Sequence, residues 1–274
     1  MARWPALPSA EPSPSASATL PCCSRAERIG SGLGPWVDIA IDPLEGNTII
    51  AKGGANAVSV VAMAEAGGFL VPSCPSMGKL IIGPGLPEGV VNLNEPIANT
   101  LRALAQAKKV AVSEILVCML DRPRHQDLMA QVREAGARVM LILDGDVAAG
   151  IATCDADASI DLFIGRGGAA EGILTAAAVR CIGGQMQGRL VPDARTRVLE
   201  PGGERVYTTA EMARGDVMFA VTGVTDSAML KGVRRCAGGA FTHSLVMRSK
   251  TGTIRRIQAR HDFTRKADHG VQER

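Results

Sequence analysis

The feature that most limits the fold of this chain is the alternation of helix-like and strand-like segments between residues 94 and 179. Apolar residues recur at helical spacing over 94–109, at Ile97, Leu101 and Leu104. We then expect a strand at 114–120, a helix at 124–135, strands at 138–143 and 161–164, and a helix at 169–179. This alternation predicts a mostly parallel, layered α/β sheet, with its ligand crevice beyond the carboxyl ends of the strands.

The segments on either side of this region are less regular. The apolar run 37–41 predicts a buried strand that ends at Asp42-Pro43, whereas 56–66 fits either a strand or a buried helix. Nearer the C-terminus, strands are expected at 217–221, 243–248 and 253–259, with a hairpin turn at 250–252.

The composition excludes several classes of protein. With 46% hydrophobic residues among 274, the chain can bury the core of one large or two modest domains. A net charge of +3 favours neither nucleic acid nor a membrane surface as a partner. The seven cysteines include no C-x-x-C pair, so neither a disulfide framework nor a zinc site is expected. These scattered cysteines fit a reducing cytoplasm, and no apolar run is long enough to span a bilayer, so we expect a soluble, cytoplasmic protein.

Two carboxylates flank a rigid turn at the end of the first predicted strand. Asp42 and Glu45 are separated by a proline and followed by Gly46, and at this spacing they can reach a common Mg²⁺ or Mn²⁺ ion. The same residues would also be present in an ordinary turn whose carboxylates cap backbone amides. The spacing alone leaves both interpretations open.

Two further polar clusters follow predicted strands. Arg122 and Arg124 stand on either side of Pro123 and can bind a phosphate through bidentate hydrogen bonds, or can simply begin a solvated basic helix. Asp144 and Asp146, on either side of Gly145, can bind sugar hydroxyls or help to hold a metal. One of these aspartates can instead be the N-cap of the next helix.

A glycine-rich segment at 165–168 leads from a predicted strand into a predicted helix. Free amides at such a junction favour a bound phosphate or carboxylate. Glu171 falls in the first turn of the helix, where an acidic residue also stabilises the helix dipole without any further role. None of the histidines shows metal-ligand spacing, and only His125 lies beside one of the clusters.

Taken in order, these segments resemble the class II fructose-1,6-bisphosphatases of bacteria, within the lithium-sensitive, metal-dependent phosphatase superfamily. The resemblance rests on VDIAIDPLEG (37–46), LDRPRH (120–125), LDGDVA (143–148) and GGAAEG (167–172). TGVTD (222–226), KGVR (231–234) and RSKTGT (248–253) add to it. Several ordered matches are far more specific than any single one.

The resemblance implies a layered αβαβα fold that hydrolyses the 1-phosphate of fructose 1,6-bisphosphate in gluconeogenesis, with Mn²⁺ or Mg²⁺ as cofactor. Asp42, Glu45 and Glu171 would be the catalytic, metal-binding carboxylates. The implied substrate contacts are Glu45, Gly46, Asn47, Ser76, Arg122, Pro123, Arg124, Asp144, Gly145, Asp146 and Gly168. Asn47 and Ser76 stand where the family normally carries a threonine and a tyrosine.

The family normally carries further acidic ligands upstream, whereas residues 1–35 contain only Glu11 and Glu27, so we expect this segment of the family to be missing. Alternatives are therefore a sedoheptulose 1,7-bisphosphatase, or a silent homologue that binds a sugar phosphate or a partner subunit. Assembly of the chain into a homo-oligomer is a further alternative. We expect a disordered extension at 1–35, a partial metal-motif domain at 36–105, an α/β substrate-binding region with C-terminal strands at 106–262, and a frayed tail at 263–274.

Overall fold

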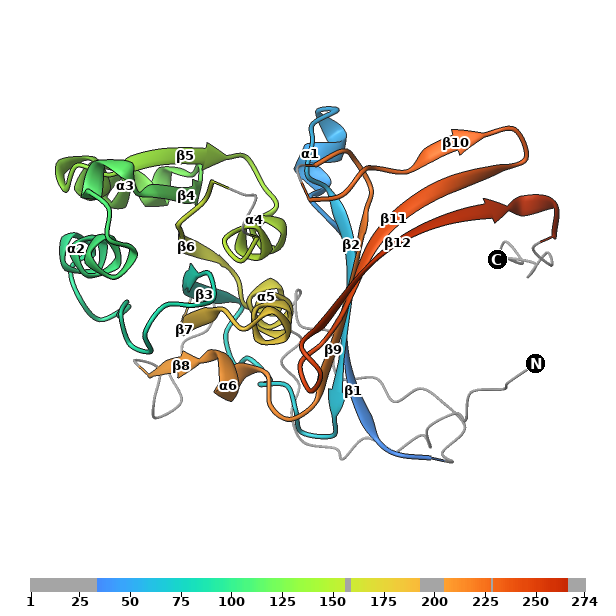
Figure 1. Ribbon diagram of the computed structural model, residues 1–274, viewed down its shortest axis with the longest axis horizontal. Coiled ribbons are helices and arrows are strands. Elements are labelled where there is room, and N and C mark those ends of the chain that lie inside the picture. Colours follow the sequence, from blue (N-terminus) through green and yellow to red (C-terminus); the bar gives the residue numbers. More distant parts are fainter. Residues whose placement is uncertain (1–33, 156–158, 193–204, 228, 266–274) are drawn as a thin grey trace.

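The computed structural model describes residues 34–155, 159–192, 205–227 and 229–265. These residues form two six-stranded sheets with helices between and beside them (Figure 1). The predicted α/β class is confirmed. The predictions for residues 1–33 and 266–274 lie outside the described residues, and 263–265 form a short 3₁₀ turn.

The first sheet has the order β1-β2-β9-β11-β10, with β12 also paired to β11. All of its strand pairs are antiparallel. Its strands are β1 (Val37–Glu45), β2 (Val58–Glu65), β9 (Val217–Gly223), β10 (Arg234–Cys236), β11 (Gly239–Arg248) and β12 (Thr253–Asp262). The segment 56–66, for which the sequence allowed a strand or a buried helix, therefore forms a strand. The predicted C-terminal strands and hairpin are confirmed.

The second sheet has the order β5-β4-β6-β3-β7-β8 and is mixed. Its strands are β3 (Ser76–Ile82), β4 (Leu116–Leu120), β5 (Arg138–Ile142), β6 (Leu162–Gly168), β7 (Gln185–Val191) and β8 (Val206–Thr208). The prediction of a mostly parallel sheet is wrong, because only the β4–β5 and β4–β6 pairs are parallel. These are the strands that the chain connects through α3 and α4, whereas β3 and β7 run antiparallel to their neighbours.

The helices form layers with the two sheets. They are α1 (Asn47–Ala51), α2 (Ile97–Lys108), α3 (Gln126–Glu134), α4 (Asp146–Ala152), α5 (Ala169–Ile182) and α6 (Thr209–Met212). Figure 1 shows α2 and α3 on one side of the second sheet, and α4 and α5 between the two sheets. The described residues place no helix on the outer face of the first sheet, which would be the fifth layer of the predicted sandwich. No described helix has the length and apolar composition needed to cross a membrane.

Helix α5 packs between the two sheets and contributes to a core that both sheets share. Ala176, Ala177, Ala178 and Val179 are fully buried, and residues of both sheets belong to the same apolar core. Small side chains are needed here because a helix covered on both faces leaves little room between its backbone and the sheets. The run of alanines therefore lets two sheets share one helix layer.

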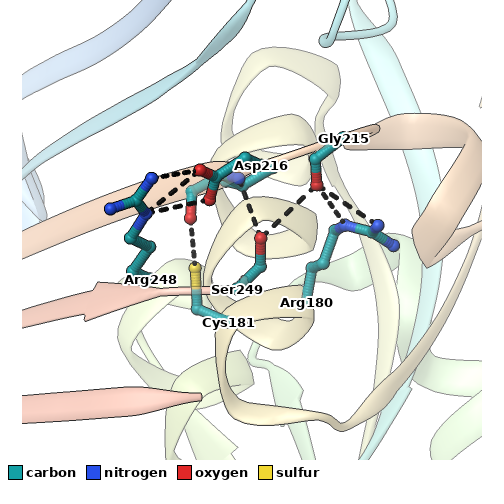
Figure 2. A network of polar contacts seen from close by, with 7 residues as sticks. Arg180, Cys181, Gly215, Asp216, Arg248 and Ser249 are labelled. Carbon is teal, nitrogen blue, oxygen red and sulfur yellow. Dashed lines mark hydrogen bonds and ion pairs between the residues drawn. The ribbon is translucent and has the colours of Figure 1, made fainter. Parts of the chain in front are cut away.

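The carboxyl-terminal end of α5 is anchored to the first sheet by the polar network in Figure 2. Arg180 donates two hydrogen bonds of 3.3 Å to the carbonyl of Gly215, and the thiol of Cys181 donates to the carbonyl of Val217 over 3.4 Å. These contacts hold one end of the helix, so that its amino-terminal end has a fixed position relative to both sheets.

Strand β1 differs from its prediction in length and in burial. It continues through Pro43 to Glu45, and its register against β2 shifts between Asp42 and Glu45. This bulge accommodates Pro43, which has no amide hydrogen for the ladder. Within the described residues β1 is an edge strand, and its Ile39 and Ile41 are exposed because no described helix covers the outer face of this sheet.

The close packing of α5 makes a direct prediction. Ala177→Leu should lower the free energy of unfolding by about 1–3 kcal/mol, because the added methylenes have no space between the sheets. Urea denaturation measures the change, and Ala130→Leu on the exposed face of α3 is the matched control, expected to have little effect. Equal midpoints for the two variants would contradict the described packing.

Candidate active site

Three predicted clusters meet where β4, β5 and β6 end. These strands run parallel to one another, so the segments that follow them lie at the same edge of the second sheet. The end of β1 joins this edge from the first sheet. Glu45 Oε1 accepts a hydrogen bond of 3.3 Å from the amide of Val147, and the amide of Thr48 lies 3.4 Å from Asp144 Oδ2. The two acidic motifs of the sequence are therefore in contact.

Glycines make both turns at this contact possible. Gly46 has a φ of 101° and Gly145 a φ of 89°, which is the left-handed region that residues with side chains rarely adopt. A Cβ on Gly145 would also lie only 3.3 Å from Ile49 and 3.7 Å from Glu45 Oε2. The backbone of the predicted Asp144–Asp146 segment can thus approach the Glu45 carboxylate closely.

The resulting acidic cluster is deeply buried. Glu45 is 4% exposed and Asp146 is 6% exposed. The pKa of Glu45 is raised to about 9, mainly by burial and then by the charges of Asp146 and Asp144, while the hydrogen bond from the Val147 amide opposes the shift. Glu45 Oε2 is buried without a hydrogen-bond partner among the described residues. A carboxylate in this position is strongly destabilised unless a cation lies beside it.

Lys79 supplies one positive charge to this cluster. It is 1% exposed on β3 and forms an ion pair with Asp146. A Cβ on Gly167 would lie 3.2 Å from Lys79 Nζ and would collide with the Asp146 carboxylate, so this glycine makes room for the pair. Lys79 is not among the site residues expected from the sequence, although a charged residue directly before the apolar run 80–82 is a usable signal.

Glu171 lies at the start of α5, close to two other predicted residues. Its carboxylate folds back over Gly168, where any Cβ would collide with it. Gly168 is paired with Ser76 across β6 and β3. The segment 165–168 is therefore part of a strand and not the predicted anion-binding loop, because β3 satisfies its backbone through the ladder.

The predicted arginines gather near the same edge. The Arg124 guanidinium donates two hydrogen bonds, of 3.1 and 2.7 Å, to the carbonyl of Arg166, and Arg122 donates one of 3.0 Å to the carbonyl of Asp121. Burial lowers the pKa of Arg124, and the charges of Arg122 and Arg166 lower it further. The helix predicted from Arg124 starts at Gln126, after a 3₁₀ turn over Pro123–His125.

The His125 side chain connects this turn to β6 through hydrogen bonds. Its Nδ1 lies 2.8 Å from the carbonyl of Leu120, and its Nε2 lies 2.8 Å from the amide nitrogen of Arg166. The ring must therefore carry its proton on Nδ1, donate to Leu120 and accept from Arg166. Burial lowers the pKa of His125, which favours this neutral form. Because the β4–β6 ladder reaches only to Cys118 and Phe163, His125 bridges the strands where they separate.

The Asp42 carboxylate bonds to the backbone of its own turn. Its Oδ1 accepts a hydrogen bond of 3.1 Å from the amide of Leu44, which is the capping role that the sequence left open. Among the described residues, no group of three acidic, histidine or cysteine side chains surrounds a common point closely enough to hold a metal. The joint ligand set of Asp42, Glu45 and Glu171 stays a prediction.

The oxygen donors that are present nevertheless fit a hard divalent cation. The unpartnered Glu45 Oε2 is a free, buried carboxylate oxygen, and Asp144 and Asp146 lie beside it. Carboxylate oxygens are the ligands that Mg²⁺ and Mn²⁺ prefer.

Comparison with known proteins agrees with this chemistry. Residues 15–261 match the family described as bacterial fructose-1,6-bisphosphatase, glpX-encoded. The chain is 40% identical over 259 residues to the fructose-1,6-bisphosphatase 1 class 2 of Escherichia coli K12. The aligned region covers 88% of this chain and 77% of that protein. Identity and coverage are the same for the fructose-1,6-bisphosphatase class 2 of Shigella flexneri.

The buried carboxylate predicts how stability depends on pH without metal. The folded state keeps a proton on Glu45 up to about pH 9, whereas the unfolded chain releases it near 4.5, so stability is lost as pH rises through this window. In the presence of a chelator, Glu45→Gln should raise stability by roughly 1–3 kcal/mol at pH 8 and leave it nearly unchanged below pH 4.5. Thermal unfolding measures this, with exposed Glu134→Gln as the control. A destabilised Glu45→Gln at pH 8 would contradict the raised pKa.

The bridging role of His125 predicts a loss of stability on substitution. His125→Phe keeps the ring but leaves the Leu120 carbonyl and the Arg166 amide without partners, at a cost of roughly 2–4 kcal/mol. His261→Phe on β12 is a suitable control because, among the described residues, the His261 side chain forms one hydrogen bond, with Thr242. Chemical denaturation of both variants tests the difference, and a near-native His125→Phe would show that the bridge contributes little.

Proposed function

This chain belongs to the bacterial class 2 fructose-1,6-bisphosphatase family, and we propose that it hydrolyses the 1-phosphate of fructose 1,6-bisphosphate to give fructose 6-phosphate and phosphate. The observation that carries the proposal is the juxtaposition of two opposite charge clusters. Glu45, Asp144 and Asp146 form one cluster, and Arg122 and Arg124 stand beside it, close enough for the Asp146 charge to act on Arg124. A cation site next to an anion site is what metal-assisted phosphate hydrolysis needs.

Mn²⁺ or Mg²⁺ would be held by Glu45, with Asp42 and Glu171 as the further ligands. When bound, such an ion lowers the pKa of a water molecule and neutralises charge on the phosphate and the leaving oxygen. The Leu44 amide occupies one acceptor position of Asp42 Oδ1, which leaves the other lone pairs of this carboxylate for a metal. Glu171 is supported by its place in the first turn of α5, above Gly168.

The remaining side chains bind and orient the substrate. Arg122 and Arg124 donate hydrogen bonds to phosphate oxygens, and the short 3₁₀ turn begun by Pro123 limits their freedom. Asp144 and Asp146 accept hydrogen bonds from sugar hydroxyls. Lys79 holds the Asp146 side chain in place, because its ammonium group is buried against that carboxylate.

The smaller predicted contacts complete the site. Gly46 and Asn47 lie where β1 passes into α1, next to the Glu45 carboxylate. Ser76 and Gly168 lie opposite each other at the ends of β3 and β6. Their small size leaves the sheet open for a sugar ring, and an asparagine amide at position 47 can hydrogen-bond a phosphate oxygen.

We assign the reaction to gluconeogenesis in the cytoplasm. The cytoplasmic assignment is supported by the cysteines, since the five that the structure describes are free thiols. Assembly into a homo-oligomer stays a prediction.

Activity should require both the metal and Glu171. The purified chain is expected to release phosphate from fructose 1,6-bisphosphate with Mn²⁺ or Mg²⁺ and to lose this activity with excess chelator. Glu171→Gln should reduce kcat/KM by about 100-fold or more, since it removes a charge directed at the reacting phosphate and its metal, while exposed Glu134→Gln should not. Turnover that persists in the chelator would overturn the proposal.

A substrate panel separates the alternatives. Equal or faster hydrolysis of sedoheptulose 1,7-bisphosphate would change the assigned substrate. If no sugar phosphate is hydrolysed but fructose 1,6-bisphosphate raises the melting temperature, the chain is a binding homologue without catalytic activity.

A further inference from the structure

The two faces of the first sheet have different surroundings. Alternate residues of its strands, such as Val60, Phe219 and Leu245, are buried on the face that packs against helix α5. On the other face, no helix of the described residues covers the sheet (Figure 1). The side chains at the intervening positions project from this outer face, so they determine what it can bind.

The strand register aligns these outward side chains in rows across the sheet, because directly paired residues project from the same face. One row consists of Ile39, Met63, Met218 and Arg248, and the next consists of Ile41, Val61, Ala220, Val246 and Arg255. Each row is therefore apolar from β1 to the far side of the sheet, where an arginine ends it. We call the seven apolar members of these two rows the outer patch.

The outer patch is more exposed than a core cluster of the same residue types. Ile39 is 41% exposed, Ile41 58% and Met218 42%, and the other four members are only partly buried. The next row is polar, since the hydroxyls of Thr222 and Ser244 lie 2.8 Å apart and share a hydrogen bond. A contiguous apolar surface with a polar rim is typical of a protein–protein interface.

The charge pattern of this face makes it complementary to itself. Across a two-fold axis the same surface faces its own copy, so an interface of this kind must not bring like charges together. The seven members of the outer patch are uncharged, and Arg248 and Arg255 lie together on one side of it. A two-fold axis parallel to the strands places that side over β1 of the other copy. The aliphatic stems of the arginines then cover Ile39 and Ile41.

The size of the face also matches the needs of a stable dimer. Its strands, about 4.8 Å apart, and its three rows, about 7 Å apart, cover roughly 20 by 20 Å. With side chains and rim included, this surface is on the order of the 800 Å² per partner that a standard interface buries. Face-to-face packing at about 10 Å is a regular arrangement for two sheets that each have an apolar face.

The free edge of β1 is a less suitable contact for a second copy. The bulge between Asp42 and Glu45 interrupts the regular backbone of this strand, and Pro43 has no amide hydrogen to donate. Pairing of two copies through this edge would also leave most of the outer patch in water. Contact through the face therefore buries more apolar surface than contact through the edge.

We propose that two copies of this chain associate through the outer faces of their first sheets, with the two outer patches packed against each other across a two-fold axis. This inference concerns assembly and does not depend on the proposed reaction. It assigns the surface of a homodimer, which the sequence left without a location.

Sedimentation velocity over a range of protein concentrations is the first test, and the parent chain should be a dimer. Ile41→Lys and Met218→Lys should each raise the dissociation constant by about 100-fold or more, since the two-fold axis buries the new charge twice without a partner. Lysine is preferred to glutamate, which could pair with an arginine of the other copy. Val71→Lys is the matched control, because Val71 is 84% exposed and lies outside the patch.

The lysine variants should remain folded, because their side chains lie in water in the single chain. Circular dichroism and a cooperative thermal transition verify this. A parent chain that is monomeric at every concentration would overturn the inference, and so would lysine variants that dimerise as the parent does.

Photo-crosslinking then identifies the occupant of the patch. Benzoylphenylalanine replaces Met218 in an equal mixture of unlabelled and ¹⁵N-labelled protein, and mass spectrometry locates the crosslinks. We expect crosslinks between labelled and unlabelled copies, to peptides of β1, β2 or β9. Crosslinks confined to one copy and reaching residues 1–33 would show that the chain covers its own sheet, which would overturn the dimer.

Discussion

The packing of one helix between two sheets is the constraint on which the rest of this structure depends. Helix α5 can be shared only because its central residues are alanines, which allow a sheet to approach from each side. Its carboxyl-terminal end is bound to the first sheet through Arg180 and Cys181. Its other end begins directly after β6, so Glu171 lies over Gly168 at the end of the second sheet. The active site is therefore a product of the same packing that stabilises the core.

Charge separation is the second organising feature of the site. Buried carboxylates gather where the two sheets meet, and their mutual repulsion is relieved only in part by Lys79. The arginines gather near the edge where the strands of the second sheet end, and they bind backbone carbonyls instead of carboxylates. Direct ion pairs between the two groups would stabilise the free protein but would block both sites. A divalent cation and a sugar bisphosphate together supply the charges that each group lacks.

The sequence identified the elements and the acidic motifs better than their arrangement. Helix α2 follows from apolar spacing, α3 and α5 follow from the alternation with strands, and all three lie near their predicted bounds. Strands β3 and β7 were not indicated, because Gly78, Lys79 and Arg189 interrupt the apolar pattern. Without β3 the glycines of 165–168 look like a loop, although they are the part of β6 that pairs with it. Local patterns cannot reveal such pairing, since the partner lies some ninety residues away.

The same distance in sequence explains why the functional residues were found unevenly. Asp42, Glu45 and the two motifs after β4 and β5 lie in turns, where special residue types are visible in the sequence itself. His125, Lys79 and Arg166 act through contacts between elements, so their roles appear only when β3, β4 and β6 are brought together. Their common surroundings are glycines at 78, 165, 167 and 168, which leave space for a side chain from a neighbouring element or for a ligand. In this fold the small residues determine where the charged ones can act, and recognition of the substrate then rests on charge and hydrogen bonding, in keeping with an aromatic content of only 3%.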